Sequence, residues 1–360
     1  MNAVRLPKRL PLCAALALAA CTAAPPAPSP APSAATVAGE ARLEDVRAQL
    51  YALADDSMQG RMTGTEGMFR AARYIARELR AAGVEPAGDD GYLQRLPLGW
   101  TEGRGGRRVP GLLESWADTA KIAPADRGVG VNVVGILRGS DPALRDQAVM
   151  VAAHFDHLGI GRPVGGDSIY NGADDDASGV VTVLQIARAL AAGPPPKRTV
   201  VFLLSTGEEV GLLGTCWYIH HPVVPIDRMA AQLEIEMVGR PDPAAGGAGK
   251  AWLTGYERST LGDALAANGV AIVADPRPAE NFFERSDNIA YARLGIPAHT
   301  LSTFNLHSDY HAPTDEADRI DYAHMTEVVR AAVRAARLVA DGPAPAWKPG
   351  GRPAAGNVCG

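Results

Sequence analysis

The sequence predicts an α/β fold, a three-layer sandwich around a largely parallel mixed β-sheet. Short runs of apolar residues recur from residue 131 onward and are too short to be helices, so they indicate buried strands. Longer helical patterns separate these runs. Strands that alternate with helices are typical of a parallel sheet covered on both faces. Several of the runs also end in acidic or histidine residues, which points to a site along one edge of the sheet.

The elements follow one another in a regular order. Two early helices are expected at residues 40–53 and 68–82, the second ended by Gly83. The strand signal at 92–96 is weak. The expected later strands are residues 131–137, 148–153, 199–205, 229–237 and 298–302. The expected later helices are residues 180–191, 212–220, 261–268, 287–294 and 324–341, with three prolines at 194–196 breaking the chain between the first two.

Composition excludes several classes of protein. The chain has 360 residues, of which 47% are apolar, enough for a large core. The net charge of −5 leaves no electrostatic footprint for nucleic acid. Four cysteines are too few and too scattered for a zinc finger, so a metal would be held by oxygen and nitrogen.

The N-terminal 39 residues look like a targeting segment. A basic start and a short apolar run end in Leu18-Ala19-Ala20-Cys21, which resembles the lipobox of bacterial lipoproteins. Residues 1–20 are therefore predicted to be a signal peptide, with Cys21 as the lipidated residue and 21–39 as a Pro/Ala-rich tether. The expected location is the outer membrane facing the periplasm, or the periplasm itself. Ordinary secretion is the alternative.

A single domain is expected at 40–341, with a Pro/Gly-rich tail at 342–360. Cys216 and Cys359 would remain after processing and could pair in an oxidising compartment.

The chemistry concentrates where the predicted strands end. His154 and Asp156 follow the strand at 148–153, and Glu208-Glu209 follow the strand at 199–205. Glu236 closes the strand at 229–237. The carboxyl ends of neighbouring strands meet at one crevice in open α/β sheets. Three consecutive aspartates, 174 to 176, lie between these elements and would repel one another if buried together. A metal cation bound by nitrogen and oxygen removes that cost.

Five motifs together resemble the M28 family of di-zinc aminopeptidases. They are His154-Phe155-Asp156, the 172–179 segment GADDDASG, the 206–214 segment TGEEVGLLG, the 236–240 segment EMVGR and the 310–315 segment YHAPTD. The likeness runs from about residue 43 to the terminal helix and includes the 56–61 loop DSMQGR.

The resemblance implies roles for individual residues. Asp174 would bridge two zinc ions and precede a cis peptide bond to Asp175. His154 and Glu236 would complete one zinc site, and Glu209 and His311 the other. Asp156 would orient His154, and Glu208 would be the general base. Two Zn²⁺ would balance the three ligand carboxylates and a bridging hydroxide.

Some assignments have rivals. The family most often has aspartate where this chain has Glu236, and Glu234 on the same strand face is the substitute. His307 is the rival of His311, while His157 is expected beside the ligands or at the rim. Asn288 stands where many relatives carry histidine, which bears on substrate preference.

The resemblance implies an aminopeptidase acting on peptides with a free N-terminus. A glutaminyl cyclase of the same fold, with one zinc, is the first alternative. A non-catalytic binding lipoprotein is the second. Retention of both His154 and an acid at 236 favours two metals, and retention of Glu208 favours catalysis.

Overall fold

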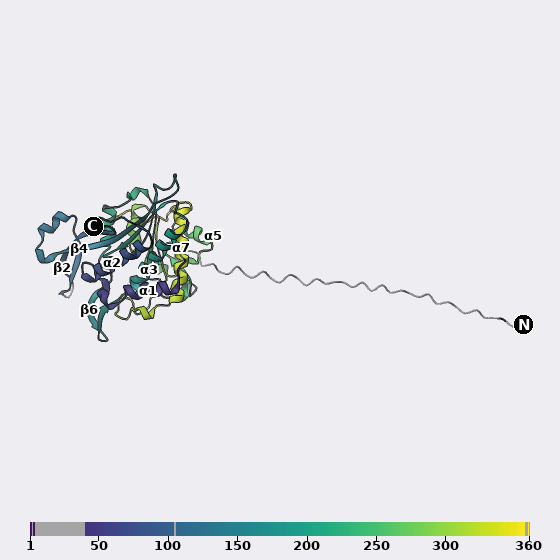
Figure 1. Ribbon diagram of the computed structural model, residues 1–360, viewed down its shortest axis with the longest axis horizontal. Coiled ribbons are helices and arrows are strands. Elements are labelled where there is room, and N and C mark those ends of the chain that lie inside the picture. Colours follow the sequence, from purple (N-terminus) through teal and green to yellow (C-terminus); the bar gives the residue numbers. More distant parts are fainter. Residues whose placement is uncertain (2, 4–39, 104–105, 357–358, 360) are drawn as a thin grey trace. The chain divides into compact units, whose positions relative to one another are not determined.

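A ten-stranded mixed sheet organises the computed structural model, which describes residues 1, 3, 40–103, 106–356 and 359 (Figure 1). The strand order is β11-β10-β12-β9-β5-β8-β4-β2-β3, and β1 pairs with β4. Four neighbouring central strands are parallel: β12 (Ala298–Ser302), β9 (Met229–Glu236), β5 (Ala148–His154) and β8 (Thr199–Ser205). Their carboxyl ends therefore lie along one edge.

The outer strands are mostly antiparallel. They are β1 (Glu85–Pro86), β2 (Leu93–Glu102), β3 (Arg108–Leu112), β4 (Arg127–Leu137), β10 (Ala251–Leu253) and β11 (Ile272–Ala274). A separate hairpin consists of β6 (Gly159–Val164) and β7 (Asp167–Tyr170).

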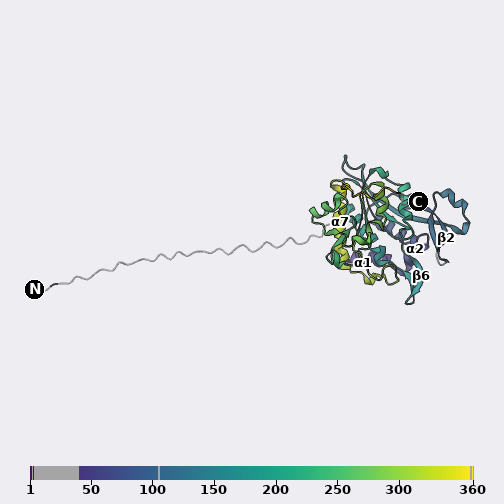
Figure 2. The same cartoon turned by 180° about the vertical axis from the view of Figure 1, so that it is seen from behind.

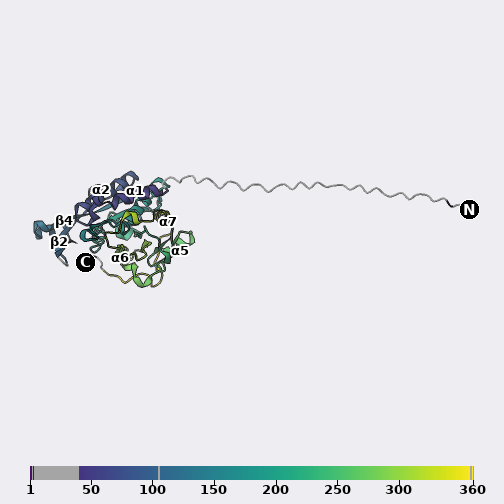
Figure 3. The same cartoon turned by 90° about the horizontal axis from the view of Figure 1, so that it is seen from below.

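Helices cover both faces of the sheet. One layer contains α1 (Leu43–Leu53), α2 (Glu66–Ala81), α3 (Gly179–Ala192) and α7 (Tyr322–Asp341), which pack on one another. The opposite side carries α4 (Leu213–His220) and α6 (Asn288–Leu294), while α5 (Thr260–Ala267) packs beside β11. Figure 3 shows α1 and α2 above the sheet and α6 below it, and Figure 2 shows α1 and α7 from behind.

Side chains of β5 alternate between two cores, as the twofold period of a strand requires. Val149 and Val151 pack into the cluster formed with α1, α2, α3 and α7. Met150 and Ala152 pack into the cluster that contains Tyr291 of α6. Burial on both faces explains why the central strands have continuous apolar sequences.

The predicted α/β fold is confirmed. The sequence did not indicate the β6–β7 hairpin or the short strands β10 and β11. The hairpin carries its apolar side chains Ile160 and Val164 exposed, and three-residue strands are too short for a periodic pattern. Cys21 and the predicted tether lie outside the described residues. No helix among the described residues has the length and apolar character needed to cross a bilayer.

The segment after α7 returns to the domain. The indole N–H of Trp347 donates to the carbonyl oxygen of Gly295 at 2.9 Å, and the Lys348 N–H donates to the Arg258 carbonyl at 2.8 Å. Cys359 forms a disulfide with Cys216 of α4, closing a sequence separation of 143 residues. The pairing that the sequence left open is therefore present.

Candidate metal centre and active site

Ionisable side chains converge at the carboxyl edge of the central strands. His154 is the last residue of β5, Glu236 is the last residue of β9, and Glu208-Glu209 follow β8. The turn at Ala173–Ser178, which leads into α3, brings Asp175 to the same place. The parallel topology thus collects residues that are up to 82 positions apart in the sequence.

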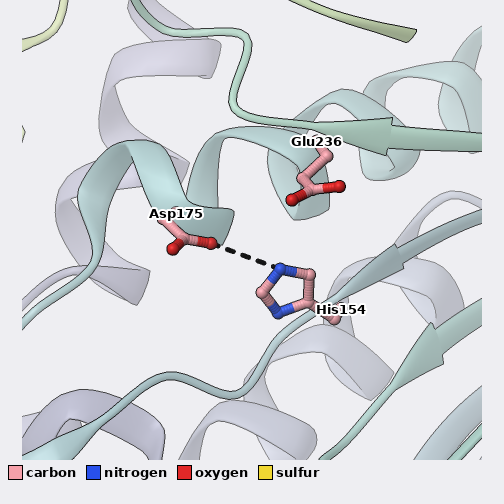
Figure 4. A group of neighbouring side chains, drawn as sticks. All are labelled: His154, Asp175 and Glu236. Atoms are coloured by element: carbon pink, nitrogen blue, oxygen red, sulfur yellow. Dashed lines mark ion pairs between the residues drawn. The ribbon is translucent and has the colours of Figure 1, made fainter. Parts of the chain in front are cut away.

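His154, Asp175 and Glu236 form the first group of potential metal ligands, with one ligand atom from each lying within 4.8 Å of the others. The His154 Nε2 atom is 3.3 Å from the Asp175 Oδ1 atom. Figure 4 shows that the imidazole and the two carboxylates point toward the same space. His154 is fully buried, so its position is set by the core.

A second group shares Asp175 and contains His157 and Glu209. The His157 Nδ1 atom is 2.7 Å from the Glu209 Oε1 atom. The Nε2 atom of His311 lies 3.1 Å from an oxygen of Asp175 and 3.1 Å from Glu209. Two histidines therefore flank this pair of carboxylates. His157 was expected beside the ligands or at the rim, but it is buried within the group.

The structure corrects the assignment of Asp174 by one residue. Asp175, not Asp174, is common to both groups, and the cis peptide bond joins Asp175 to Asp176 rather than Asp174 to Asp175. Asp174 instead accepts a hydrogen bond from the Gly239 N–H at 2.7 Å and contacts the His307 Nε2 atom at 3.0 Å. Adjacent residues of a turn point in different directions, and sequence alone does not reveal which of three identical side chains faces the centre.

The third aspartate anchors the backbone. One oxygen of Asp176 accepts the N–H groups of Gly179 at the start of α3 and of Met237 after β9. The three neighbours thus have two kinds of role: Asp174 and Asp176 bind backbone N–H groups, and Asp175 faces the cluster.

The rivals of Glu236 and His311 lie elsewhere. Glu234 accepts a hydrogen bond from the Gln232 side chain at 2.5 Å and belongs to neither group. His307 pairs with Asp174 instead of Asp175. Glu236 belongs to the first group, and the Nε2 atom of His311 lies 3.1 Å from Asp175 and from Glu209 of the second.

Asp156 links His154 to Glu208. Its Oδ1 atom accepts the backbone N–H of Glu208 at 3.2 Å and lies 3.6 Å from the Nδ1 atom of His154. Its Oδ2 atom accepts the hydroxyl of Thr63 at 3.1 Å. A buried carboxylate in this place can fix both the imidazole and the loop that carries Glu208.

The electrostatics of the cluster favour cations. Burial raises the pKa of the Glu208 carboxyl well above its usual value, and burial with neighbouring carboxylates raises the pKa of Glu236 to about 7. Burial opposes charge on His311 as well, but its hydrogen bonds to Asp175 and Glu209 raise its pKa to about 10. The shifts have one origin: carboxylates are crowded in a dry place, and in the described part of the chain no ammonium or guanidinium forms an ion pair with Asp175, Glu208, Glu209 or Glu236.

The donor set fits zinc. Imidazole nitrogen and carboxylate oxygen are the ligands that zinc uses when cysteine is absent. Neither the buried Nε2 atom of His154 nor the buried Oε1 atom of Glu209 makes a hydrogen bond of good geometry, although each lies within ion-pair distance of a neighbouring side chain. Buried polar atoms in this state are unfavourable. Bound cations would satisfy these atoms and compensate the carboxylate charge.

Sequence reasoning missed the role of Arg61. This guanidinium is fully buried and donates to four carbonyl oxygens: those of Leu53, Phe155, Asn171 and Gly172. It therefore ties the loop after His154 to the loop before the aspartates. The 56–61 loop had stood out only through the resemblance, because no pattern in the sequence signals that an arginine is buried.

A pocket adjoins the cluster. Asp175, Glu208 and Glu236 form part of its lining. Aromatic rings from distant segments form another part, namely those of Trp252, Phe282, Phe304 and Tyr310.

A model of peptidase family M28 matches residues 132–336, more than half of the chain and the whole of the cluster. The chain belongs to peptidase family M28. The curated protein "Probable leucine aminopeptidase 2" of Aspergillus fumigatus is 26% identical over 273 residues, which are 74% of this chain but only 49% of that protein. The chain thus spans about half the length of this M28 relative.

Solved structures share the fold of this M28 chain. The aminopeptidase from Aneurinibacillus sp. strain AM-1 superposes with a TM-score of 0.60 at 17% identity, covering 85% of this chain and 96% of that one. The glutaminyl cyclase of Porphyromonas gingivalis superposes with a TM-score of 0.57 at 17% identity, covering 82% and 97%. At such identities the likeness is one of fold.

Proposed function

We propose that this M28 protein is a zinc-dependent aminopeptidase that binds two zinc ions per chain and removes N-terminal residues from peptides. The observation that carries the proposal is the sharing of Asp175 between two groups of ligand atoms, with Glu208 at the wall of the adjoining pocket. Two cations placed about one carboxylate are typical of di-metal hydrolytic sites.

His154, Asp175 and Glu236 would hold one zinc, and Asp175, Glu209 and His311 the other, with His157 beside Glu209. Bound zinc lowers the pKa of water and polarises a carbonyl group, which is the chemistry that peptide hydrolysis needs.

The protein's own groups would move the proton and position the substrate. Glu208 takes the proton of the attacking water and passes it to the leaving amine, so that each step avoids a free strong acid or base. Asp156 keeps Glu208 in place by accepting its backbone N–H. The acidic surroundings favour a positively charged or metal-binding α-amine, so a peptide with a free N-terminus is preferred over a blocked one.

A glutaminyl cyclase remains the second candidate because a protein of that name shares the fold. The two activities differ in metal number and in product. A one-zinc protein that releases ammonia from N-terminal glutamine is the cyclase outcome.

The test combines metal analysis with a substrate panel. We expect about two zinc ions per purified chain and hydrolysis of aminoacyl p-nitroanilides that stops on chelation and returns with zinc. Peptides with N-terminal glutamine are assayed beside them for cyclisation. One zinc with cyclisation and no hydrolysis would overturn the proposal in favour of the cyclase, and zinc binding with neither activity would favour a binding lipoprotein.

We further propose that the protein is exported and anchored by a lipid on Cys21. The support is the sequence Leu18-Ala19-Ala20-Cys21 after a basic start and an apolar run. Cys21→Ser should move the protein from the membrane fraction to the soluble fraction with unchanged activity per molecule, since the proposed tether separates the anchor from the site. A wild-type protein found soluble in its own host would contradict the anchor.

A further inference from the structure

The pocket beside the metal centre contains one cationic side chain. Arg285 lines it together with Trp252 and Phe282, while the carboxylates of Asp175, Glu208 and Glu236 line it elsewhere. The guanidinium of Arg285 lies over the Phe282 ring, 4.9 Å from its centroid. Stacking of this kind holds an arginine side chain in place and leaves its N–H groups free to donate.

Arg285 has no anionic partner of its own. Within residues 40–103, 106–356 and 359, no carboxylate lies within ion-pair distance of it, whereas Arg240, Arg277 and Arg330 all pair with acids. Its side chain is exposed at the pocket.

A second unpaired donor lines the same pocket. Trp252 is 1% exposed, yet its indole N–H has no hydrogen-bond partner. Two hydroxyl groups of the pocket differ from these donors, because Thr300 donates to Asn288 and Ser302 donates to the carbonyl oxygen of Met237. The pocket lining thus includes two satisfied hydroxyls, those of Thr300 and Ser302, and two side chains with unused N–H donors, Arg285 and Trp252.

The turn that carries Arg285 is held in register with the sheet. Asn288 donates to the carbonyl oxygen of Phe283 at 3.0 Å and accepts the hydroxyl of Thr300 in β12 at 3.0 Å. Asn288, which stands where many relatives carry histidine, therefore connects the turn that carries Arg285 to β12, a strand that lines the pocket.

Resting on the proposed aminopeptidase function, we propose that Arg285 is a specificity-determining residue that binds a carboxylate of the substrate. A carboxylate has only acceptors, so it complements donors such as guanidinium and indole N–H groups. Two parts of a peptide supply one: the side chain of an N-terminal aspartate or glutamate, and the C-terminal carboxylate of a dipeptide. The acidic centre and Arg285 would then hold the two oppositely charged ends of a short zwitterionic substrate or residue.

Matched substrates separate the two sources. Glutamyl and glutaminyl p-nitroanilide differ in side-chain charge, and alanyl-alanine and its amide differ in C-terminal charge. The variants are Arg285→Ala, Arg285→Glu and Trp252→Phe, which keeps the ring but removes the N–H. Arg258→Ala is the control, because Arg258 also stacks on a phenylalanine, Phe283 at 4.4 Å, but does not line the pocket.

We expect the wild-type protein to prefer the charged member of at least one pair in kcat/KM. Arg285→Ala should lower that preference by roughly ten- to hundredfold, the range for a hydrogen bond to a charged group. Arg285→Glu should reverse it, Trp252→Phe should reduce it less, and Arg258→Ala should leave it unchanged. The pair that responds identifies the source of the carboxylate.

The inference fails if neither pair shows a preference, or if the preference survives in Arg285→Ala. Hydrolysis of alanyl p-nitroanilide serves as the reference: if zinc-loaded wild-type protein does not cleave it, the aminopeptidase proposal itself fails. Calorimetric titration of the same proteins with free glutamate and glutamine gives the Arg285 comparison without turnover. Equal affinities for glutamate and glutamine, together with equal affinities for alanyl-alanine and its amide, would contradict the proposed role of Arg285 in binding.

Discussion

Two buried sets of charge lie close to the loop that leads to Asp175, and their hydrogen bonding differs: Arg61 bonds to the Asn171 and Gly172 carbonyls of that loop, and the carboxylate cluster includes Asp175 itself. Arg61 is fully buried, but each of its bonds ends on a backbone carbonyl that the fold supplies. Asp175, Glu208 and Glu236 are crowded together, and the buried Nε2 atom of His154 and Oε1 atom of Glu209 make no hydrogen bond of good geometry. A buried charge whose hydrogen bonds are complete belongs to the structure of the protein, whereas incomplete bonding indicates a place for something the chain does not itself contain.

The largest expected effect distinguishes the neighbouring aspartates. Asp175→Asn should abolish turnover and lower the zinc content, because one carboxylate common to both ligand groups becomes a neutral amide. Asp174→Asn should keep its zinc, since Asp174 binds Gly239 and His307 instead. Zinc per chain, measured by mass spectrometry, decides between them. Loss of zinc in Asp174→Asn with retention in Asp175→Asn would restore the assignment expected from the sequence.

The next largest effect distinguishes the proposed general base, Glu208, from the proposed zinc ligand, Glu209. Glu208→Gln keeps the shape of the side chain but cannot accept a proton, so kcat should fall by roughly 10²- to 10⁴-fold at unchanged zinc content. Glu209→Gln is the matched control and should lose zinc, because its carboxylate belongs to the second ligand group. If Glu208→Gln is the variant that loses zinc, the two roles are interchanged.

Arg61 tests the other side of the comparison. Arg61→Met should lower the free energy of unfolding by roughly 3–5 kcal/mol, because it leaves buried carbonyl oxygens without donors. Arg61→Lys should lose less, since it keeps the charge but not the fork of donors. Urea unfolding of the zinc-free proteins measures the loss without a contribution from metal. A loss within 1 kcal/mol of zero for Arg61→Met would show that water or the chain replaces these bonds readily.

The smallest expected effect on stability concerns His299. This residue shows a third way in which the protein buries a titratable group, namely in its neutral form. Its Nδ1–H donates to the Thr254 carbonyl, so its Nε2 atom accepts the hydroxyl of Ser259. Burial lowers the pKa of His299 from 6.5 to about 4. The folded state resists protonation, so this stabilisation is complete above pH 6.5 and is lost as the pH falls toward 4.

The full loss through His299 corresponds to about 3 kcal/mol. We expect the unfolding free energy of His299→Gln to fall less steeply between pH 6.5 and 4 than that of the wild-type protein. The difference between the two slopes isolates His299 from the acid cluster, whose groups titrate in both proteins. Parallel slopes would mean that His299 is already protonated or solvated in the folded state.

The sequence by itself determined the layers of the fold and the place of the site. Apolar runs that end in His154, Glu208-Glu209 and Glu236 were readable because a strand buried on both faces is apolar throughout and its end is where polarity returns. The pieces β3, β6 and β7 were not, because most of their side chains are not buried in a core. Strands β10 and β11 were not, because three residues are too few for a periodic pattern.

Only the tertiary structure decided which of the identical neighbours faces the cluster of potential ligands. Asp174, Asp175 and Asp176 differ by the direction in which the turn points them, and that direction depends on contacts with Gly239 and Met237, far away in the chain. The same holds for His157, which lies 2.7 Å from Glu209. It also holds for the two arginines, since Arg61 is buried among backbone carbonyls and Arg285 lines the pocket. The residue types in a short segment are enough to indicate a strand. The partner of a charged side chain, in contrast, depends on how the fold brings distant backbone and side chains within hydrogen-bond distance.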